Sequence, residues 1–213
     1  MDLTICETFA SLLGESTLAG LPAFFIRLTG CNLRCRYCDT THAYDGGETR
    51  PVDSLVEQAR GSATRLVLVT GGEPLLQKGT TALLEGLIEA GLEVLLETNG
   101  SLPLGGVDAR VRRIVDVKCP GSGMSGHNLW ANLEVLTPRD EVKFVIDDED
   151  DFTWALDVAQ RYRLTGRVPV LISPVFGALS LPEVAAWIVN SGHPVRLNLQ
   201  LHKYIWGPEA RGV

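Results

Sequence analysis

Residues 30–42 read GCNLRCRYCDTTH and hold three of the five cysteines of this 213-residue chain. Cys31, Cys35 and Cys38 follow the spacing C-x3-C-x2-C, soon after the short apolar run FFIRL (24–28). Metal ligands placed just after a buried strand are typical of α/β folds, whose active sites lie at the carboxyl ends of the strands. The stretch therefore indicates where a strand ends and where the chemistry of the protein takes place.

Six further short apolar runs recur along the chain. They are RLVLVT (65–70), EVLLET (93–98), RIVDVK (113–118), VKFVI (142–146), PVLIS (169–173) and VRLNLQ (195–200). Most are nearly continuous in apolar residues, which is typical of strands buried on both faces of a parallel sheet. Helical patterns lie between several of them, at 53–60, 78–91, 148–162 and 180–192.

Strands that alternate with helices predict an α/β fold. An eight-unit barrel usually needs about 250 residues, which is more than this chain has. The stretches 99–112 and 119–140 show weak helical patterns, so some connections should be loops or short helices. We therefore predict a partial, open TIM-like barrel of (β/α)6 type, with mostly parallel strands and abbreviated helices. It should form a single domain over residues 1–213.

The composition excludes several classes of partner. The net charge of −7 argues against nucleic acid, because binding to a polyanion depends on a basic surface. No apolar run approaches the roughly 18 residues that a membrane helix requires, and the acidic start is unlike a signal peptide. We expect a cytoplasmic protein with a small-molecule substrate and no membrane partner. In that reducing compartment, a tight cysteine cluster should bind metal rather than form disulfides.

Two kinds of metal site fit the cysteine spacing. Cys31, Cys35 and Cys38 could form a Cys3His zinc site with His42. Three thiolates on one loop also suit a 4Fe–4S cluster, which is normally held by four cysteines and would here keep one iron open to a small molecule. The residues favour the cluster and leave zinc as the alternative.

Unusual polar or glycine-rich segments follow five of the predicted strands. They are TGCNLRCRYCDTT (29–41), TGGEP (70–74), TNGS (98–101), KCPGSG (118–123) and QLHKYIW (200–206). Strand ends of this kind meet on one rim of a barrel-like fold, so the segments should line one site. Asp116 and Lys118 offer opposite charges there, suited to the hydroxyls and the carboxylate of a ligand. Alternatively, they form a solvated ion pair.

The cysteine spacing, with an aromatic residue before the last cysteine, resembles the signature of the radical S-adenosylmethionine (SAM) enzymes. The segment VLVTGGEP (67–74) is similar to their glycine-rich SAM segment. The resemblance implies a 4Fe–4S cluster on Cys31, Cys35 and Cys38, whose open iron binds SAM and which cleaves SAM to a radical when reduced. It also implies SAM contacts from Tyr37, Cys38, Asp39, Gly71, Gly72, Glu73, Asn99, Asp116, Val117 and Lys118.

Residues 7–44 closely resemble the N-terminus of the 7-carboxy-7-deazaguanine synthases, and DVKCPGSG (116–123) and QLHKYIWG (200–207) extend the likeness over essentially the whole chain. The resemblance implies ring contraction of 6-carboxy-5,6,7,8-tetrahydropterin with loss of ammonia, SAM being re-formed. It implies Mg²⁺ on Thr40. The implied substrate contacts are Leu12, Leu13, Gly14, Glu15, Arg27, Thr70, Gln200 and His202.

Several of these residues suit such a ligand on chemical grounds. Glu15 could accept two parallel hydrogen bonds from guanidine-like N–H groups. Arg27 offers a fork for a carboxylate, or else pairs with an acid on the rim. Gln200 and His202 are predicted to alternate along one strand and to face the cavity together. Leu13 stands where the family often has glutamine, and we assign no role to the C-terminal residue.

The resemblance also implies a homodimer and an external one-electron reductant such as flavodoxin. Three other functions stay open: a glycyl-radical-enzyme activating enzyme, a zinc-stapled binding module and an iron–sulfur electron carrier. The first would share the cysteine loop, TGGEP and TNG. Glu15 and Arg27, which precede the cysteines, favour the pterin substrate.

Overall fold

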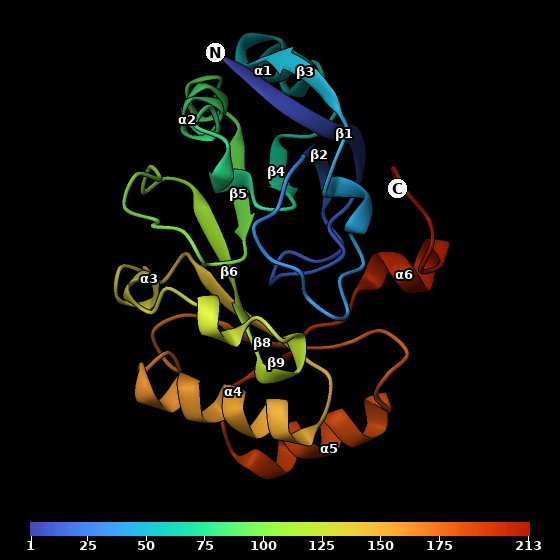
Figure 1. Ribbon diagram of the computed structural model, residues 1–213, viewed down its shortest axis with the longest axis vertical. Coiled ribbons are helices and arrows are strands. Elements are labelled where there is room, and N and C mark those ends of the chain that lie inside the picture. The colour runs from blue at the N-terminus through green and yellow to red at the C-terminus, as the bar shows by residue number, and fades with distance from the viewer.

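The computed structural model describes residues 1–213 and contains one nine-stranded sheet in the order β3-β1-β2-β4-β5-β6-β7-β8-β9 (Figure 1). Neighbours from β2 to β9 run parallel, and β1 and β3 add an antiparallel edge. The strands are β1 (Asp2–Leu12), β2 (Pro22–Leu28), β3 (Glu48–Pro51), β4 (Leu66–Gly71), β5 (Glu93–Thr98), β6 (Arg112–Lys118), β7 (Glu141–Ile146), β8 (Val170–Pro174) and β9 (Arg196–Leu197). Because β3 and β9 are not paired with each other, the sheet is an open barrel, which confirms the predicted fold class.

Helices pack against the outer face of the sheet, except for the last one, which lies at the gap between its edges. They are α1 (Val52–Arg60), α2 (Thr80–Glu89), α3 (Ala131–Glu134), α4 (Glu149–Arg161), α5 (Leu181–Ser191) and α6 (Leu201–Trp206). α1 and α2 lie beside the first strands, and α4 and α5 lie at the opposite end of the molecule (Figure 1). The connection from β5 to β6 has no helix, and the next has only 3-10 turns and α3, as the weak patterns predicted. None of the helices has both the length and the apolar composition needed to cross a membrane.

All seven predicted strands form. Two further strands were not predicted, and the last predicted strand is shorter than expected. β1 and β3 form the antiparallel edge, where β1 is largely half-buried and carries no continuous apolar run. The last predicted strand covers only Arg196–Leu197 instead of 195–200. The chain turns into α6 at residue 201, which changes the setting of the functional residues expected there.

Alternate residues of the parallel strands face two environments. Outward residues such as Val69, Leu96 and Phe144 are buried in the apolar clusters that also contain residues of the covering helices. Inward residues are apolar in the middle of the strands and polar two positions later. The inward pairs are Phe25 and Arg27, Leu68 and Thr70, Leu95 and Glu97, Ile114 and Asp116, and Leu171 and Ser173. The barrel interior is therefore a core at one end and a polar cavity at the other.

The gap in the open sheet is bridged by a set of contacts that we call the seam. They are Leu201 N to Gly14 O at 2.8 Å, Ser16 N to Asn198 Oδ1 at 3.0 Å, Gln200 Nε2 to Asp39 Oδ2 at 2.9 Å and Lys203 Nζ to Asp39 Oδ2 at 2.6 Å. The seam joins the β1–β2 loop and the cysteine loop to α6 and to the residues just before it. The two edges of the sheet thus border one cavity, although their strands do not pair with each other.

Candidate active site

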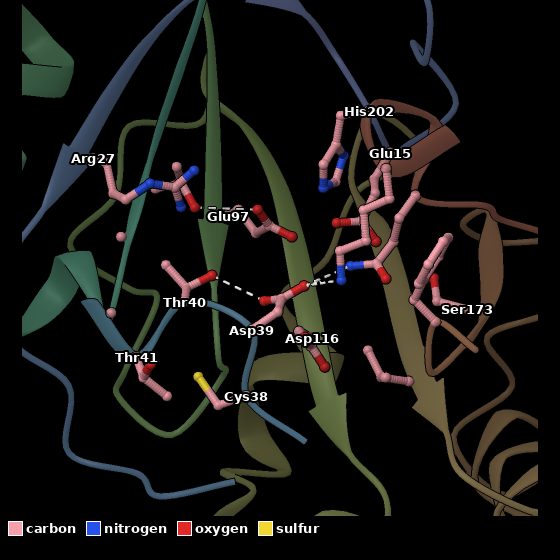
Figure 2. Close-up of a pocket in the computed structure, with 18 of the residues that line it drawn as sticks. Glu15, Arg27, Cys38, Asp39, Thr40, Thr41, Glu97, Asp116, Ser173 and His202 are labelled. Carbon is pink, nitrogen blue, oxygen red and sulfur yellow. Dashed lines mark hydrogen bonds and ion pairs between the residues drawn. The ribbon is translucent and has the colours of Figure 1, made fainter. Parts of the chain in front are cut away.

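The inward polar residues open into a cavity of about 660 Å³ at the carboxyl ends of the strands. The β1–β2 loop, the cysteine loop, the ends of β2 and β4–β8, α6 and residues 208–213 line it. Figure 2 shows Glu15, Glu97, Asp116 and His202 around this space. Every residue predicted from the sequence to belong to the site lines the cavity, except Glu73 and Val117.

The three loop cysteines are free, half-buried thiols on the cavity wall. Sγ of Cys31 accepts contacts from Leu33 N at 3.4 Å and from Asn99 Nδ2 at 3.8 Å. Burial raises the pKa of Cys35 and Lys118 opposes this rise. Lys118 therefore favours the thiolate, which is the form that binds metal.

The geometry does not support the zinc alternative. No three His, Cys, Asp or Glu side chains converge so as to hold a single metal ion. Nε2 of His42 lies 3.6 Å from Oε1 of Glu7 instead of completing a ligand set with the thiols. A four-iron cluster is held by cysteine thiolates and does not need His42 as a ligand, so the loop suits the cluster better than a single zinc ion.

The two glycines of TGGEP hold the end of β4 against the cysteine loop. A Cβ at Gly71 would lie 2.7 Å from the backbone nitrogen of Leu28, and a Cβ at Gly72 would lie 2.8 Å from Cβ of Cys31. Gly71 also has φ 147°, a conformation that other residues rarely adopt. These glycines therefore fix the position of the first cysteine relative to the sheet.

Two residues predicted to contact SAM have their side chains outside the cavity. Glu73 is fully buried and accepts hydrogen bonds from Thr98 Oγ1 at 2.9 Å, Asn99 N at 2.7 Å and Leu75 N at 3.0 Å. Val117 has the opposite orientation along β6 from its neighbours and lies in the apolar core. The Glu73 side chain supports the segment that carries Asn99.

Asp116 and Lys118 form a largely buried pair rather than a solvated one. Lys118 Nζ lies 2.9 Å from Asp116 Oδ2. Oδ1 of Asp116 is buried and has no hydrogen-bond partner. Because a buried acceptor without a partner is costly, this oxygen suits a hydroxyl donor of a ligand in the cavity.

A lysine that the sequence analysis missed lies among three acids. Nζ of Lys143 is 2.5 Å from Glu97 Oε1, 3.4 Å from Glu15 Oε2 and 3.7 Å from Asp116 Oδ2. Burial raises the pKa of Glu15 to about 7, against the opposing effect of Lys143. Burial acts on Glu97 too, but Lys143 and the hydroxyl of Thr70 hold the pKa of Glu97 below its usual value. The sequence does contain a signal for Lys143, because a charged residue stands at an inward-facing position of the apolar run VKFVI.

Arg27 pairs with an acid on the neighbouring strand. Its Nε donates to Oε1 of Glu7 at 2.7 Å, and both side chains line the cavity. Glu7 is therefore the rim acid that was expected as the alternative partner of Arg27. Glu7 binds Nε, so the terminal nitrogens of the guanidinium are not engaged by this bond.

The prediction that Gln200 and His202 alternate along one strand is wrong, because Gln200 precedes α6 and His202 lies within it. Both still line the cavity. Gln200 and Lys203 bind Asp39, whose other oxygen accepts from the hydroxyl of Thr40 at 2.9 Å (Figure 2). Burial opposes ionisation of Asp39, but Lys203 and these hydrogen bonds hold its pKa below the usual range.

The C-terminal residues, to which the sequence analysis gave no role, also reach the cavity. Residues 208–213 line its wall, including Arg211 and Val213. No local pattern in GPEARGV signals this position, because it follows from the course of α6 across the seam.

Comparison with known proteins places the chain. A model of the radical SAM superfamily matches residues 25–178. A 7-carboxy-7-deazaguanine synthase of Chlorobaculum tepidum is 44% identical over 214 residues, covering 99% of this chain and 97% of the relative. One of Koribacter versatilis is 40% identical over 226 residues, covering 99% and 100%. The chain belongs to the 7-carboxy-7-deazaguanine synthase family of radical SAM proteins.

Solved structures agree on the fold of this family member. The crystal structure of QueE from Escherichia coli matches with a TM-score of 0.69 and 23% identity over 93% of this chain and 94% of that chain. Streptococcus suis SuiB bound to S-adenosylmethionine matches with a TM-score of 0.53 and 13% identity over 79% and 44%. At these identities the likeness supports the open-barrel fold alone.

Membership in the radical SAM superfamily implies a 4Fe–4S cluster and SAM, and the site fits both groups. Three free thiols lie on one loop at the cavity, beside the cation of Lys118. The unpartnered Oδ1 of Asp116 suits a ribose hydroxyl of SAM, and Lys118 is placed near it for a carboxylate.

Proposed function

We propose that the protein is a carbon–nitrogen lyase that converts 6-carboxy-5,6,7,8-tetrahydropterin to 7-carboxy-7-deazaguanine, with SAM used catalytically. The product and one ammonia together account for all atoms of the substrate, so the conversion needs no net oxidant. When bound, the cluster and SAM would supply the radical chemistry that starts the rearrangement. The observation that carries the proposal is that Glu15 and Arg27 line the same cavity as the cysteine loop.

The protein would bind and orient the pterin through opposite charges. Arg27 would take the substrate carboxylate with its terminal nitrogens, since Glu7 holds only Nε. Glu15 would face the polar edge of the pyrimidine ring and bind it through hydrogen bonds. Thr70 and His202 line the wall between these groups as further candidate contacts.

Magnesium, partners and location complete the proposal. Thr40 and its neighbour Asp39 offer hard oxygens, which Mg²⁺ prefers, and substrate oxygens and water would complete the shell. We also propose a homodimer that accepts electrons from an external one-electron donor such as flavodoxin. A cytoplasmic location is consistent with five free cysteines.

An anaerobic assay tests the function. Reconstituted protein, SAM, a strong reductant and the tetrahydropterin should yield the deazaguanine and ammonia in equal amounts, without net loss of SAM. Cys35→Ser should abolish the product, whereas Cys6→Ser should retain it, because Cys6 lies outside the cavity lining. Absence of product from protein with an intact cluster would refute the proposal. A colourless protein with one tightly bound zinc would refute the cluster itself.

A further inference from the structure

Lys143 carries a buried positive charge on the wall of the cavity. It lies in the middle of β7, is 5% exposed, and its neighbours Val142 and Phe144 are fully buried. Its ammonium group reaches acids from three other elements: Glu15 in the β1–β2 loop, Glu97 on β5 and Asp116 on β6. A lysine is rarely buried in this way unless it is paired.

The acids that Lys143 contacts are held differently. Glu97 accepts a hydrogen bond from Lys143 at 2.5 Å and another from the Thr70 hydroxyl at 3.1 Å, so both its oxygens are engaged. Glu15 has only long contacts, from Lys143 and Asn198 Nδ2, each at 3.4 Å. Asp116 has its own cation in Lys118. Glu97 is thus fixed as an acceptor, with a second lone pair on each oxygen for a ligand, whereas Glu15 has no short hydrogen bond.

The loop that carries Glu15 is anchored rather than loose. Ser16 has φ 79°, a left-handed conformation that is uncommon for residues with a side chain. Its amide donates to Asn198 Oδ1 at 3.0 Å, and Asn198 Nδ2 donates to Ser173 at 2.7 Å. The next amide, that of Thr17, donates to the buried Glu141 at 2.9 Å. Strain that surrounding bonds maintain beside a binding group is typical of a preorganised site.

We propose that Lys143 is a positioning residue that holds Glu15 and Glu97 as two unlike acids, which together recognise the mixed donor and acceptor edge of a 2-amino-4-oxo heterocycle. The proposal rests on the proposed function. Ionised Glu97 accepts from ring N–H or amino groups. Glu15 is the acid that can retain a proton near neutral pH, which it donates to the oxo oxygen. A 2,4-diamino ring lacks that oxygen and presents a donor in its place.

Binding calorimetry under anaerobic conditions tests this on the reconstituted protein with SAM. The probes are pterin-6-carboxylate and 2,4-diaminopteridine-6-carboxylate, neither of which requires turnover. The wild-type protein should bind the oxo compound at least tenfold more tightly. Lys143→Met should reduce that preference tenfold or more. The affinity for SAM should change less, because Lys118 still balances Asp116.

The matched control is Arg113→Met. Arg113 on β6 is 5% exposed and forms a buried pair with Asp140, which lies just before β7, but Arg113 lies outside the cavity lining. If Lys143 were only structural, both variants would lose thermal stability and neither would change the preference between the probes. An unchanged preference in folded Lys143→Met therefore overturns the proposal.

A second pair of variants decides the question if Lys143→Met fails to fold. Glu15→Gln supplies a permanent N–H donor and should keep the preference within threefold, whereas Glu97→Gln should abolish it. Equal effects of the two substitutions overturn the unlike-acid assignment. If the wild-type protein binds neither probe, the proposed function fails with it. If the wild-type protein prefers the oxo probe but the variants do not change this preference as expected, only the Lys143 proposal fails.

Discussion

His202 lies directly against the backbone of Gly14, across the seam. A Cβ added to Gly14 would fall 2.9 Å from Cγ of His202 and closer still to Nδ1. The contact is reinforced by the hydrogen bond from Leu201 N to Gly14 O at 2.8 Å. The absence of a side chain at residue 14 therefore sets the position of the imidazole on the cavity wall.

Gly14→Ala should displace His202 and raise the KM for the pterin at least tenfold, with little loss of cluster content. The added methyl group would overlap the imidazole of His202, so either this ring or the helix α6 that carries it has to move. Steady-state kinetics and iron analysis measure the two effects. Gly106→Ala is the control, because nothing lies within 4 Å of its added Cβ. A wild-type KM for Gly14→Ala would contradict the prediction.

Lys203→Met should loosen α6 and the C-terminal residues. Lys203 is 9% exposed and forms the only salt bridge of Asp39, so its removal leaves that acid with Gln200 and Thr40 alone. We expect faster amide hydrogen exchange at Leu201 by tenfold or more, an opening free energy lower by about 1–3 kcal/mol. Arg60→Met, which removes an exposed ion pair on α1, should leave this exchange rate unchanged.

Glu73→Gln should weaken both folding and SAM binding. The carboxylate accepts from two backbone amides and one hydroxyl, and an amide group would direct its own N–H toward at least one of these donors. The expected loss is about 1–3 kcal/mol of unfolding free energy. Denaturant titration and SAM binding by calorimetry measure it. Glu85→Gln, at an exposed position of α2, provides the comparison, and an equal loss there would refute the role of Glu73.

Glu15→Gln should change how stability depends on pH. The pKa of Glu15 is raised to about 7 in the folded protein from 4.5, so this group takes up a proton more readily when folded. Its contribution therefore falls as the pH rises from about 4.5 to 7 and stays low above that. The variant should gain roughly 1–3 kcal/mol relative to wild type at pH 8, and this advantage should shrink toward pH 5. An advantage independent of pH would contradict the assignment.

The parallel part of the fold follows from local sequence, because buried strands and amphipathic helices each leave a pattern within a few residues. The cysteine loop, TGGEP and the Asp116–Lys118 pair were placed correctly on one cavity for the same reason. Glu97 and Lys143 were missed although they stand at inward positions of apolar runs. A single charged residue at an inward-facing position of an apolar run therefore indicates a strand that lines a functional site.

Other features depend on contacts between distant residues and could not be predicted locally. β1 is stabilised by pairing with β2 and β3 on either side and shows no apolar run of its own. Gln200 and His202 were expected to alternate along a strand, yet residues 201–206 form α6, and the seam holds Gln200 and Leu201 against Asp39 and Gly14. Glu73 and Val117 follow the family motif in sequence, but burial and strand parity turn their side chains away from the cavity.

The position of Val213 on the cavity wall bears on how the protein should be handled. An affinity tag fused after this residue would begin inside the site and compete with the pterin for space. Met1, by contrast, is 74% exposed and lies outside the cavity lining, beside α1 (Figure 1). Purification and surface immobilisation should therefore use the amino terminus, and activities measured with a C-terminal fusion should be compared with those after its removal.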